Sequence, residues 1–479
     1  MNNSKYGGTW KIFESDTVFH GDLHINQEKR IVALELLIPA RENNPMPAPP
    51  YKGKIPYICG MLFSGARVML YNCETEGEQH HVGQFTRQVI YADYAFWGLS
   101  ISAQDQIMFS KVYFDFGNIL AWARLCDYDW VFSESGGTNI VWKNKEPVSL
   151  ELNEKLTITL FPSQGNISIE RYAGEVRARQ FVTVELCYDE PVMWEQILED
   201  AKCLQYLIGL ATGRRIEIEE AKYCHYSLFQ EISQQDGTTE IIEVESEVII
   251  GVPKTPTVKG KREFEYLFTL DDLNKADTLK LWRDNYEKVE PVLDLYFSAF
   301  SPNTGSVQTL FLNLVQALET FHARFVTNDA RAFPQRVENL VNAFCKGNGY
   351  EKLWEDFLLE EAQKQNKKSI YLRSRLADLA FADGVLPFRP HGMLPTDYIR
   401  KVVDTRNYYT HYSADKLLKS FSKEELPLVN SQLLALLEYH LQILLGFDSK
   451  DVRKRTVEKI NRAEVAHLLS VNTHKIMRD

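Results

Sequence analysis

Hydrophobic and polar residues alternate from about residue 8 to residue 190, and this period of two predicts β-strands. In the segment KLTITLFP, Leu156, Ile158 and Leu160 alternate with threonines. Similar runs lie at 30–39, 106–116 and 179–188, and turn signals between strands lie at Gly7-Gly8, 73–79, 135–137, 163–166 and 173–174. Many short strands joined by tight turns favour an antiparallel sandwich or barrel. The proline-rich stretch 39–54 predicts a long exposed loop.

The pattern changes after this β-rich part. Residues 191–213 read as a helix that covers the sheet, because proline stands at the start and glycine at the end. Residues 240–250 predict one more strand, and GVPKTPTVKGK (251–261) predicts a linker. We therefore place a domain boundary near residue 265.

Beyond this boundary the apolar residues recur with the helical period of 3.6. Helices are predicted at 271–300, 305–326, 333–346, 350–365, 368–382, 396–410 and 426–445, with a helical tail after 447–451. The predicted fold class is multidomain α+β, in which residues 1–265 form an antiparallel β-sandwich-like domain and residues 266–479 an all-α bundle.

Composition excludes several classes of protein. Of the 479 residues, 44% are hydrophobic and 25% charged, which is typical of globular protein and not of disordered chains. No apolar stretch approaches the roughly 20 residues of a membrane span, and the N-terminus lacks the pattern of a secretory signal. The seven cysteines include no C-x-x-C pair, so neither a disulfide framework nor a zinc site is predicted. We expect a cytoplasmic protein that needs no metal and no other cofactor.

The net charge of −11 is unevenly distributed. Residues 270–479 hold 29 Lys and Arg against 28 Asp and Glu, whereas residues 1–269 hold 25 against 37. A broad nucleic-acid surface is therefore not expected on the first half, while basic patches remain available to the second.

The motifs of phosphate-binding loops, dinucleotide folds, zincins and α/β-hydrolases are all absent from the sequence. What remains is Arg406-Asn407-Tyr408-Tyr409-Thr410-His411, in a predicted helix. A second Arg and His five apart occur at Arg462 and His467, but there the residue after the arginine is an apolar alanine. Arg406, Asn407 and His411 are therefore the candidates for catalysis, with a salt-bridged surface feature as the commoner alternative for an Arg and a His at this spacing alone.

With this motif the chain resembles the HEPN ribonucleases, whose R-x(4–6)-H motif carries Asn, Asp or His after the arginine. The segments RKVVDTRNYYTHYS (400–413), LFLNLVQALETFHARF (310–325), FHGDLHINQEKRIVALELL (19–37) and LIGLATGRR (207–215) look like the ApeA type, a β-rich N-terminal domain fused to a C-terminal HEPN domain. The resemblance implies an anti-phage endoribonuclease of abortive infection. It also implies a 2′,3′-cyclic phosphate product and paired motifs in a homodimer or higher homo-oligomer.

The residue types suit cleavage of RNA without a metal. A histidine such as His411 can take or give the proton of a ribose hydroxyl. Arg406 can bind the phosphate, and Asn407 can hold either group in place. On a continuous helix five residues separate two side chains by about 140°, so either the helix ends near Thr410 or two subunits share a site.

Other residues are candidates for supporting roles. Asp404 could orient Arg406 or could simply be solvated. Glu319, one helical turn before His322, could support the site or pack in the core or an interface. A basic cluster that could follow RNA phosphates, with a solvated surface as the alternative, comprises Lys364, Lys367, Lys368, Arg373 and Arg375.

Two other functions remain open at this stage. The HEPN domain could be a target of nucleotidyl transfer. Proteins of that kind carry the sequence R-x(4)-H-x-Y, whereas this chain has Ser413 at the position of the tyrosine and Tyr412 one place earlier. Alternatively, the protein could be a non-catalytic dimer with a ligand-binding β domain. In the favoured interpretation RNA is the substrate, and residues 1–265 act as a sensor or brake for a trigger derived from the phage.

Overall fold

The structure is a computed structural model that describes most of the chain. The described residues are 3–476, except for 13–16, 41–43, 45–46, 48–51, 83, 102–106, 118, 133–137, 166–167, 171–174, 178, 234–238, 255–260, 274–276, 301–305, 345–355, 357–358, 361–368, 382–392 and 413. The predicted loop 39–54 and the predicted helix 350–365 lie largely outside these residues.

The chain divides into two compact units. The first comprises Met1–Gln205 and Ile216–Thr255, and the second comprises Tyr206–Arg215 and Pro256–Asp479. The second unit thus includes ten residues from the β-rich half of the sequence. The boundary near residue 265 stays a prediction.

Six strands at the start of the first unit close into a barrel. They are β1 Asn3–Ile12, β2 Val18–Asn26, β3 Ile31–Pro39, β4 Lys54–Leu62, β5 Arg67–His81 and β6 Phe85–Trp97. All pairings are antiparallel, in the order β6-β3-β2-β1-β4-β5, and a further pairing of β5 with β6 completes the ring. Closure removes the unpaired strand edges that an open sheet would expose.

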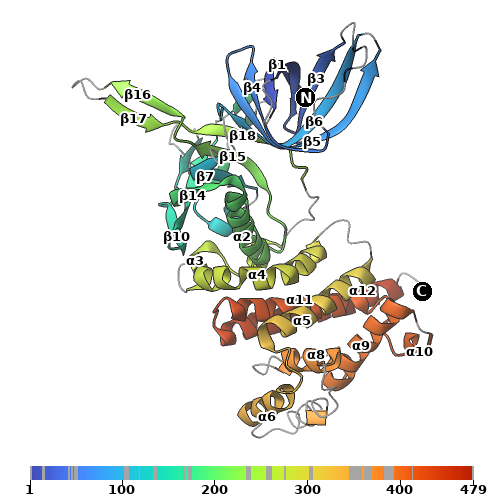
Figure 1. Ribbon diagram of the computed structural model, residues 1–479. Helices are drawn as coiled ribbons and strands as arrows, with labels where there is room; N and C mark the ends of the chain where they lie inside the picture. Colours follow the sequence, from blue (N-terminus) through green and yellow to red (C-terminus); the bar gives the residue numbers. More distant parts are fainter. Residues whose placement is uncertain are drawn as a thin grey trace. The chain divides into compact units, whose positions relative to one another are not determined.

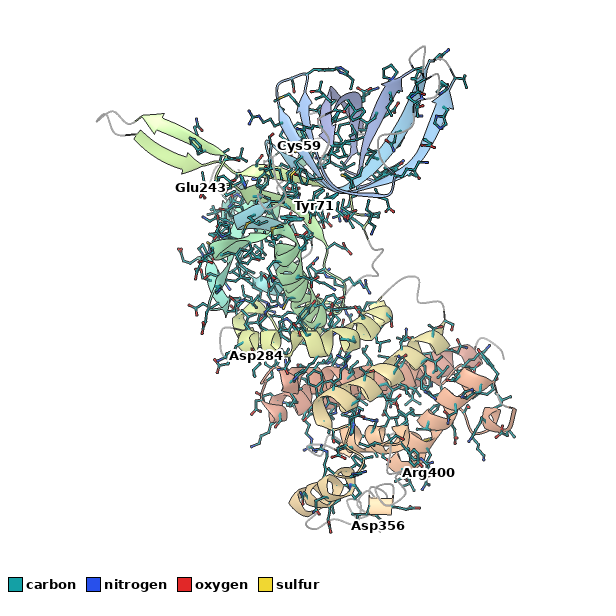
Figure 2. The ribbon with its side chains drawn as sticks, viewed as in Figure 1. Cys59, Tyr71, Glu243, Asp284, Asp356 and Arg400 are labelled. Carbon is teal, nitrogen blue, oxygen red and sulfur yellow. The ribbon has the colours of Figure 1, made fainter. Side chains whose placement is uncertain are left out.

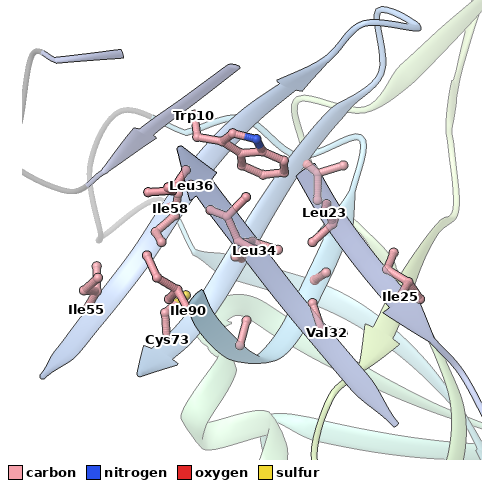
Figure 3. Close-up of a cluster of buried hydrophobic side chains, with 14 of the residues drawn as sticks. Trp10, Leu23, Ile25, Val32, Leu34, Leu36, Ile55, Ile58, Cys73 and Ile90 are labelled. Atoms are coloured by element: carbon pink, nitrogen blue, oxygen red, sulfur yellow. The ribbon is translucent and has the colours of Figure 1, made fainter. Parts of the chain in front are cut away.

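The barrel interior is an apolar core. Trp10, Leu34, Ile58 and Ile90 are completely buried within it, and they come from four different strands (Figure 3). Gly60 on β4 faces the Trp10 ring, and a Cβ atom at this position would lie only 2.2 Å from a ring carbon. A residue without a side chain is therefore required where β4 passes the indole.

The sheet continues beyond the barrel through β18, which pairs with β6. The strands from the far edge are β10 Val148–Asn153, β11 Leu156–Gln164, β14 Gln180–Met193, β7 Met108–Phe116, β15 Ile218–Cys224 and β18 Ser246–Ile250. Smaller elements are helix α1 Leu120–Ala123 and the hairpins β8 Tyr128–Phe132 with β9 Thr138–Trp142, β12 Ser168–Glu170 with β13 Glu175–Arg177, and β16 Phe229–Ser233 with β17 Thr239–Glu243.

Helix α2, Trp194–Thr212, begins on this open part of the sheet. Trp194 is fully buried, with its ring centroid 5.0 Å from that of Phe96 and 5.7 Å from that of Phe109. The expectation that this helix covers the sheet is thus confirmed at its N-terminal end.

Several local predictions were wrong in the β-rich part. Gly7-Gly8 lies inside β1 and 73–79 inside β5, so neither is a turn. Residues 191–193 extend β14, so the helix begins three residues later than predicted. The segment 240–250 contains most of β17 and all of β18, and so belongs to two strands and not to one.

The second unit is helical (Figure 1). Its described elements are η2 Glu263–Glu265, α3 Leu270–Leu273, α4 Thr278–Phe297, η3 Ser298–Phe300, α5 Val307–Phe321, the π-helical turn η4 His322–Val326, α6 Phe333–Phe344, α8 Leu372–Phe381, α9 Pro395–His411, α10 Ala414–Leu417, α11 Leu426–Leu444 and α12 Ser449–Ile476. Helix α5 contacts α4, α8, α9 and α11. The predicted helix 271–300 is in fact split into three pieces. None of the described helices combines the length and apolar character needed to cross a membrane.

Candidate active site

Helix α9 carries all three candidate catalytic residues. Its buried side chains Tyr398, Val402 and Thr405 recur every three or four positions, so one face of the helix packs into the bundle. The Thr405 hydroxyl accepts a hydrogen bond from the backbone N–H of Phe421 at 2.8 Å, which ties the helix to the segment before α11. The packing of this face and the hydrogen bond of Thr405 therefore fix the position of α9 and of the residues beside its buried face.

Arg406 and Asn407 are half-buried beside that face, and His411 is exposed. Arg406 Nη1 donates a hydrogen bond to Asn407 Oδ1 at 3.3 Å. The asparagine thus holds the guanidinium, as the sequence suggested for this position. No described residue forms a hydrogen bond with the His411 ring.

The helix continues through His411 and ends at Tyr412, which adopts the left-handed conformation with φ of 52°. The helix therefore ends one residue after Thr410, in agreement with the alternative that it ends near this residue. On a continuous helix the directions of Arg406 and His411 differ by about 140°, so one subunit presents the two groups on different sides of α9.

Three tyrosines surround the same helical turn. The Tyr412 ring lies 5.6 Å from that of Tyr408 and 6.3 Å from that of Tyr409, with angles of 65° and 84° between the ring planes. The Tyr412 side chain is 70% exposed. An exposed ring adjacent to His411 can stack on an unpaired nucleobase.

Asp404 has a different partner from the one predicted. Lys416 Nζ lies 2.8 Å from Asp404 Oδ1, and no contact between Asp404 and Arg406 is present. The role of orienting Arg406 therefore falls to Asn407, and Asp404 instead joins α9 to α10.

His322, at the end of α5, belongs to a buried polar network. It is completely buried, with Nε2 2.8 Å from Asp378 Oδ2 and Nδ1 3.0 Å from Arg375 Nη1. Because Arg375 only donates, Nδ1 accepts and the proton lies on Nε2. Burial lowers the pKa of His322, although Asp378 opposes this shift. Arg336 donates two further hydrogen bonds to Asp378, so the network ties α5, α6 and α8 together.

The contacts of this network show that the role predicted for Arg375 is wrong, and they bear on the role predicted for Glu319. Arg375 is only 6% exposed and donates to His322 and to Asn328 Oδ1, at 2.6 Å in the latter case. It is therefore a structural residue and not part of an exposed basic surface. Glu319 is half-buried. Burial lowers the pKa of Arg375, and the negative charge of Glu319 opposes this shift, which places Glu319 beside the buried network.

Of the other four residues in the predicted basic cluster, the structure describes one. Arg373 is half-buried on α8, and Lys364, Lys367 and Lys368 lie outside the described residues. The second Arg/His pair lies on α12, where Arg462 Nε donates to the carbonyl of Glu458 at 3.3 Å.

Sequence reasoning missed two features of this unit. Tyr412 is exposed where it ends α9 in the left-handed conformation. The only signal for it in the sequence was the run of aromatic residues to which it belongs. The buried His322 network joins residues more than fifty positions apart, and no local pattern announces such contacts.

Comparison with known families places this geometry in context. A family model described as ApeA N-terminal domain 1 matches residues 5–282, which is more than half of the 479 residues. The chain belongs to the ApeA family. A second model, described as Apea-like HEPN, matches residues 312–451 of this ApeA-family protein, and that range contains α9. The resemblance seen in the sequence is confirmed, as is a β-rich domain followed by a helical HEPN domain. No curated protein and no solved structure matches the chain.

Proposed function

We propose that this ApeA-family protein is a metal-independent endoribonuclease that acts in anti-phage defence by abortive infection. The observation that carries the proposal is the last turn of α9, where Asn407 holds Arg406 and the ring of His411 is exposed. The HEPN match over this helix supports a nuclease of this type. Infected cells would be arrested by the loss of their RNA.

The reaction uses the RNA's own hydroxyl as nucleophile. The 2′-oxygen attacks the adjacent phosphorus, the bond from phosphorus to the 5′-oxygen breaks, and the products are a 2′,3′-cyclic phosphate and a 5′-hydroxyl. One proton must leave the 2′-hydroxyl and one must reach the departing 5′-oxygen. Histidine suits both transfers because its ordinary pKa lies near neutrality.

Arg406 stabilises the charge on the phosphate. Its guanidinium is always protonated and donates several hydrogen bonds, so it can hold the non-bridging oxygens while negative charge develops on them. Asn407 Oδ1 occupies one donor at 3.3 Å and restricts the orientation of the side chain. Asn407 is thus a positioning residue for Arg406.

The divergence of Arg406 and His411 around α9 favours a site shared by two subunits. A twofold contact would bring two copies of each residue to one cleft, so that His411 could act as base and His411 of the partner subunit as acid. The β-rich unit would act as the sensor or brake, for a trigger derived from the phage. Its acidic excess in the sequence disfavours RNA binding there.

One observation favours a second candidate function. The Tyr412 side chain is 70% exposed, directly after His411, and could accept a nucleotidyl group that silences the domain. In that case the protein would be a regulated or non-catalytic HEPN dimer with a ligand-binding β domain. Mass spectrometry of the purified chain would find an adduct on Tyr412.

The deciding experiment incubates the full-length protein with total RNA, with and without EDTA. We expect cleavage in both samples and fragments that end in 2′,3′-cyclic phosphates. Arg406→Ala and His411→Ala should each lower the rate at least about 100-fold, because general acid–base and electrostatic catalysis contribute this much. The matched control is Arg400→Ala, since Arg400 projects from the same helix (Figure 2) and pairs with a surface carboxylate, Asp397, at 3.3 Å.

Each outcome is informative. Loss of cleavage in EDTA would show that a metal is needed. Wild-type rates in both α9 variants would show that the catalytic residues lie elsewhere. RNA that stays intact with every preparation would favour the non-catalytic alternative.

A further inference from the structure

A groove of about 640 Å³ lies in the helical unit, lined by α11, α12, Phe300 and the segment 261–267. Figure 1 shows α11 and α12 side by side. Pockets for small ligands measure about 300–1,000 Å³, so the groove has room for a molecule of nucleotide size. None of the described residues that line it lies on α9.

The deepest part of the groove carries excess positive charge. Lys261 Nζ lies 2.7 Å from Glu438 Oε1, and Lys459 pairs with the other oxygen of the same carboxylate. The Lys261 and Glu438 side chains are 8% and 2% exposed. Two amino groups therefore share one carboxylate, while burial lowers the pKa of Lys261 to about 8.

The α12 wall extends this charge toward solvent. Arg455, Lys459 and Arg462 recur at spacings of four and three, so they lie on one face of the helix. Among the described lining residues five are cationic and three acidic, in a chain whose net charge is −11. A local reversal of sign around a concave site favours an anionic ligand.

The segment 261–267 and α11 add an aromatic surface and an unused acceptor to the lining. The Phe264 side chain is 66% exposed, and the Arg262 guanidinium lies over its ring at 4.4 Å. Gln442 is 3% exposed and lines the groove, and its Oε1 has no hydrogen-bond partner in the structure. An unpartnered buried acceptor costs stability unless a ligand donates to it.

We propose that this groove binds a nucleotide, with the phosphate near Lys459 and Arg462, the base beside Phe264, and an amino group of the base donating to Gln442. The combination of cations, an aromatic face and a buried acceptor matches the three chemical parts of such a ligand. Because the groove shares no residue with α9, this proposal does not depend on RNA cleavage.

The test is calorimetric titration of the full-length protein with AMP, adenosine and inorganic phosphate. We expect saturable binding of AMP, binding of adenosine weaker by at least about tenfold because the charge-assisted contacts are lost, and competition by phosphate. Absence of saturable AMP binding would overturn the proposal. Equal affinities for AMP and adenosine would also overturn it, because the phosphate would then make no contact.

Matched variants locate the site. Arg462→Gln should weaken AMP binding about tenfold or more, whereas Arg453→Gln, the same change at an exposed position of α12 outside the groove, should leave it unaltered. Gln442→Leu should weaken AMP more than phosphate, because it removes the acceptor for the base. Unchanged AMP affinity in both groove variants, with normal circular dichroism, would show that the nucleotide binds elsewhere.

Discussion

The carboxylate of Glu438 should contribute strongly to the stability of the helical unit. Burial alone would raise its pKa, but Lys261 and Lys459 outweigh burial and lower the pKa to about 2 from an ordinary value of 4.5. Each pKa unit corresponds to about 1.4 kcal/mol, so the shift is worth about 3 kcal/mol at neutral pH. This agrees with the roughly 3–5 kcal/mol lost when one partner of a buried ion pair is removed.

The perturbation is Glu438→Gln, which keeps the shape of the side chain and removes its charge. Lys459 is 35% exposed and can turn toward water, but Lys261 is 8% exposed and cannot. The variant should lose about 3 kcal/mol in the free energy of unfolding. For a unit of 150–250 residues this corresponds to a melting temperature lower by roughly 10 °C.

The assay is thermal unfolding of the full-length protein, followed by the circular dichroism of the helices. The matched control is Glu458→Gln, because Glu458 is exposed on α12 and surface changes alter stability by about 0.5 kcal/mol or less. The folded-state pKa of Glu438 is depressed, so its contribution is present above pH 4.5 and is lost as the pH falls toward 2. The deficit of the variant should therefore shrink between pH 7 and pH 3.

Two results would refute this reasoning. A variant that melts within about 2 °C of wild type at pH 7 would show that the carboxylate contributes little net energy. A deficit that stays constant down to pH 3 would show that the loss comes from packing and not from charge.

Three further outcomes are expected. Tyr412→Ala should raise KM for single-stranded RNA about tenfold through lost stacking while Tyr412→Phe does not, and steady-state kinetics that show equal KM values would argue against the base platform. If two subunits share the site, specific activity should fall when the protein is diluted through its dimer dissociation range, whereas a monomer with full activity in sedimentation and cleavage assays would exclude sharing. Gly60→Ala should destabilise the barrel by about 1–3 kcal/mol because its Cβ would collide with Trp10, and Gly77→Ala, which meets nothing within 4 Å, is the control in denaturant titrations.

The spacing of the hydrophobic residues and the positions of glycine and proline predicted the architecture. The spacing does so because it reflects burial on one face of a helix or strand. The helix expected at 396–410 is Pro395–His411, and the strand expected at 30–39 is Ile31–Pro39. The same rules failed at Gly7-Gly8, where glycines allow close approach of neighbouring strands and do not turn the chain. Local sequence does not distinguish these two uses of glycine.

The candidate site was predictable only in its residues and not in their partners. The spacing of Arg406, Asn407 and His411 identified the motif, and the contact between Arg406 and Asn407 follows from adjacency. The partner of Asp404 lies twelve residues away on another helix. Arg375 looked like part of a basic surface, but its guanidinium is used inside the bundle. Such assignments depend on tertiary packing, which one sequence does not encode locally.

The strand β6 serves two parts of the sheet at once. One of its edges pairs with β3 at residues 85–91 and with β18 at residues 94–96, while its other edge pairs with β5. The barrel is therefore not a detachable module. Deleting it from an expression clone would strip β18 of its neighbour and expose a row of unpaired N–H and C=O groups, which invites aggregation. A fragment intended to report on the open part of the sheet should therefore retain β6 together with the strands that cover it.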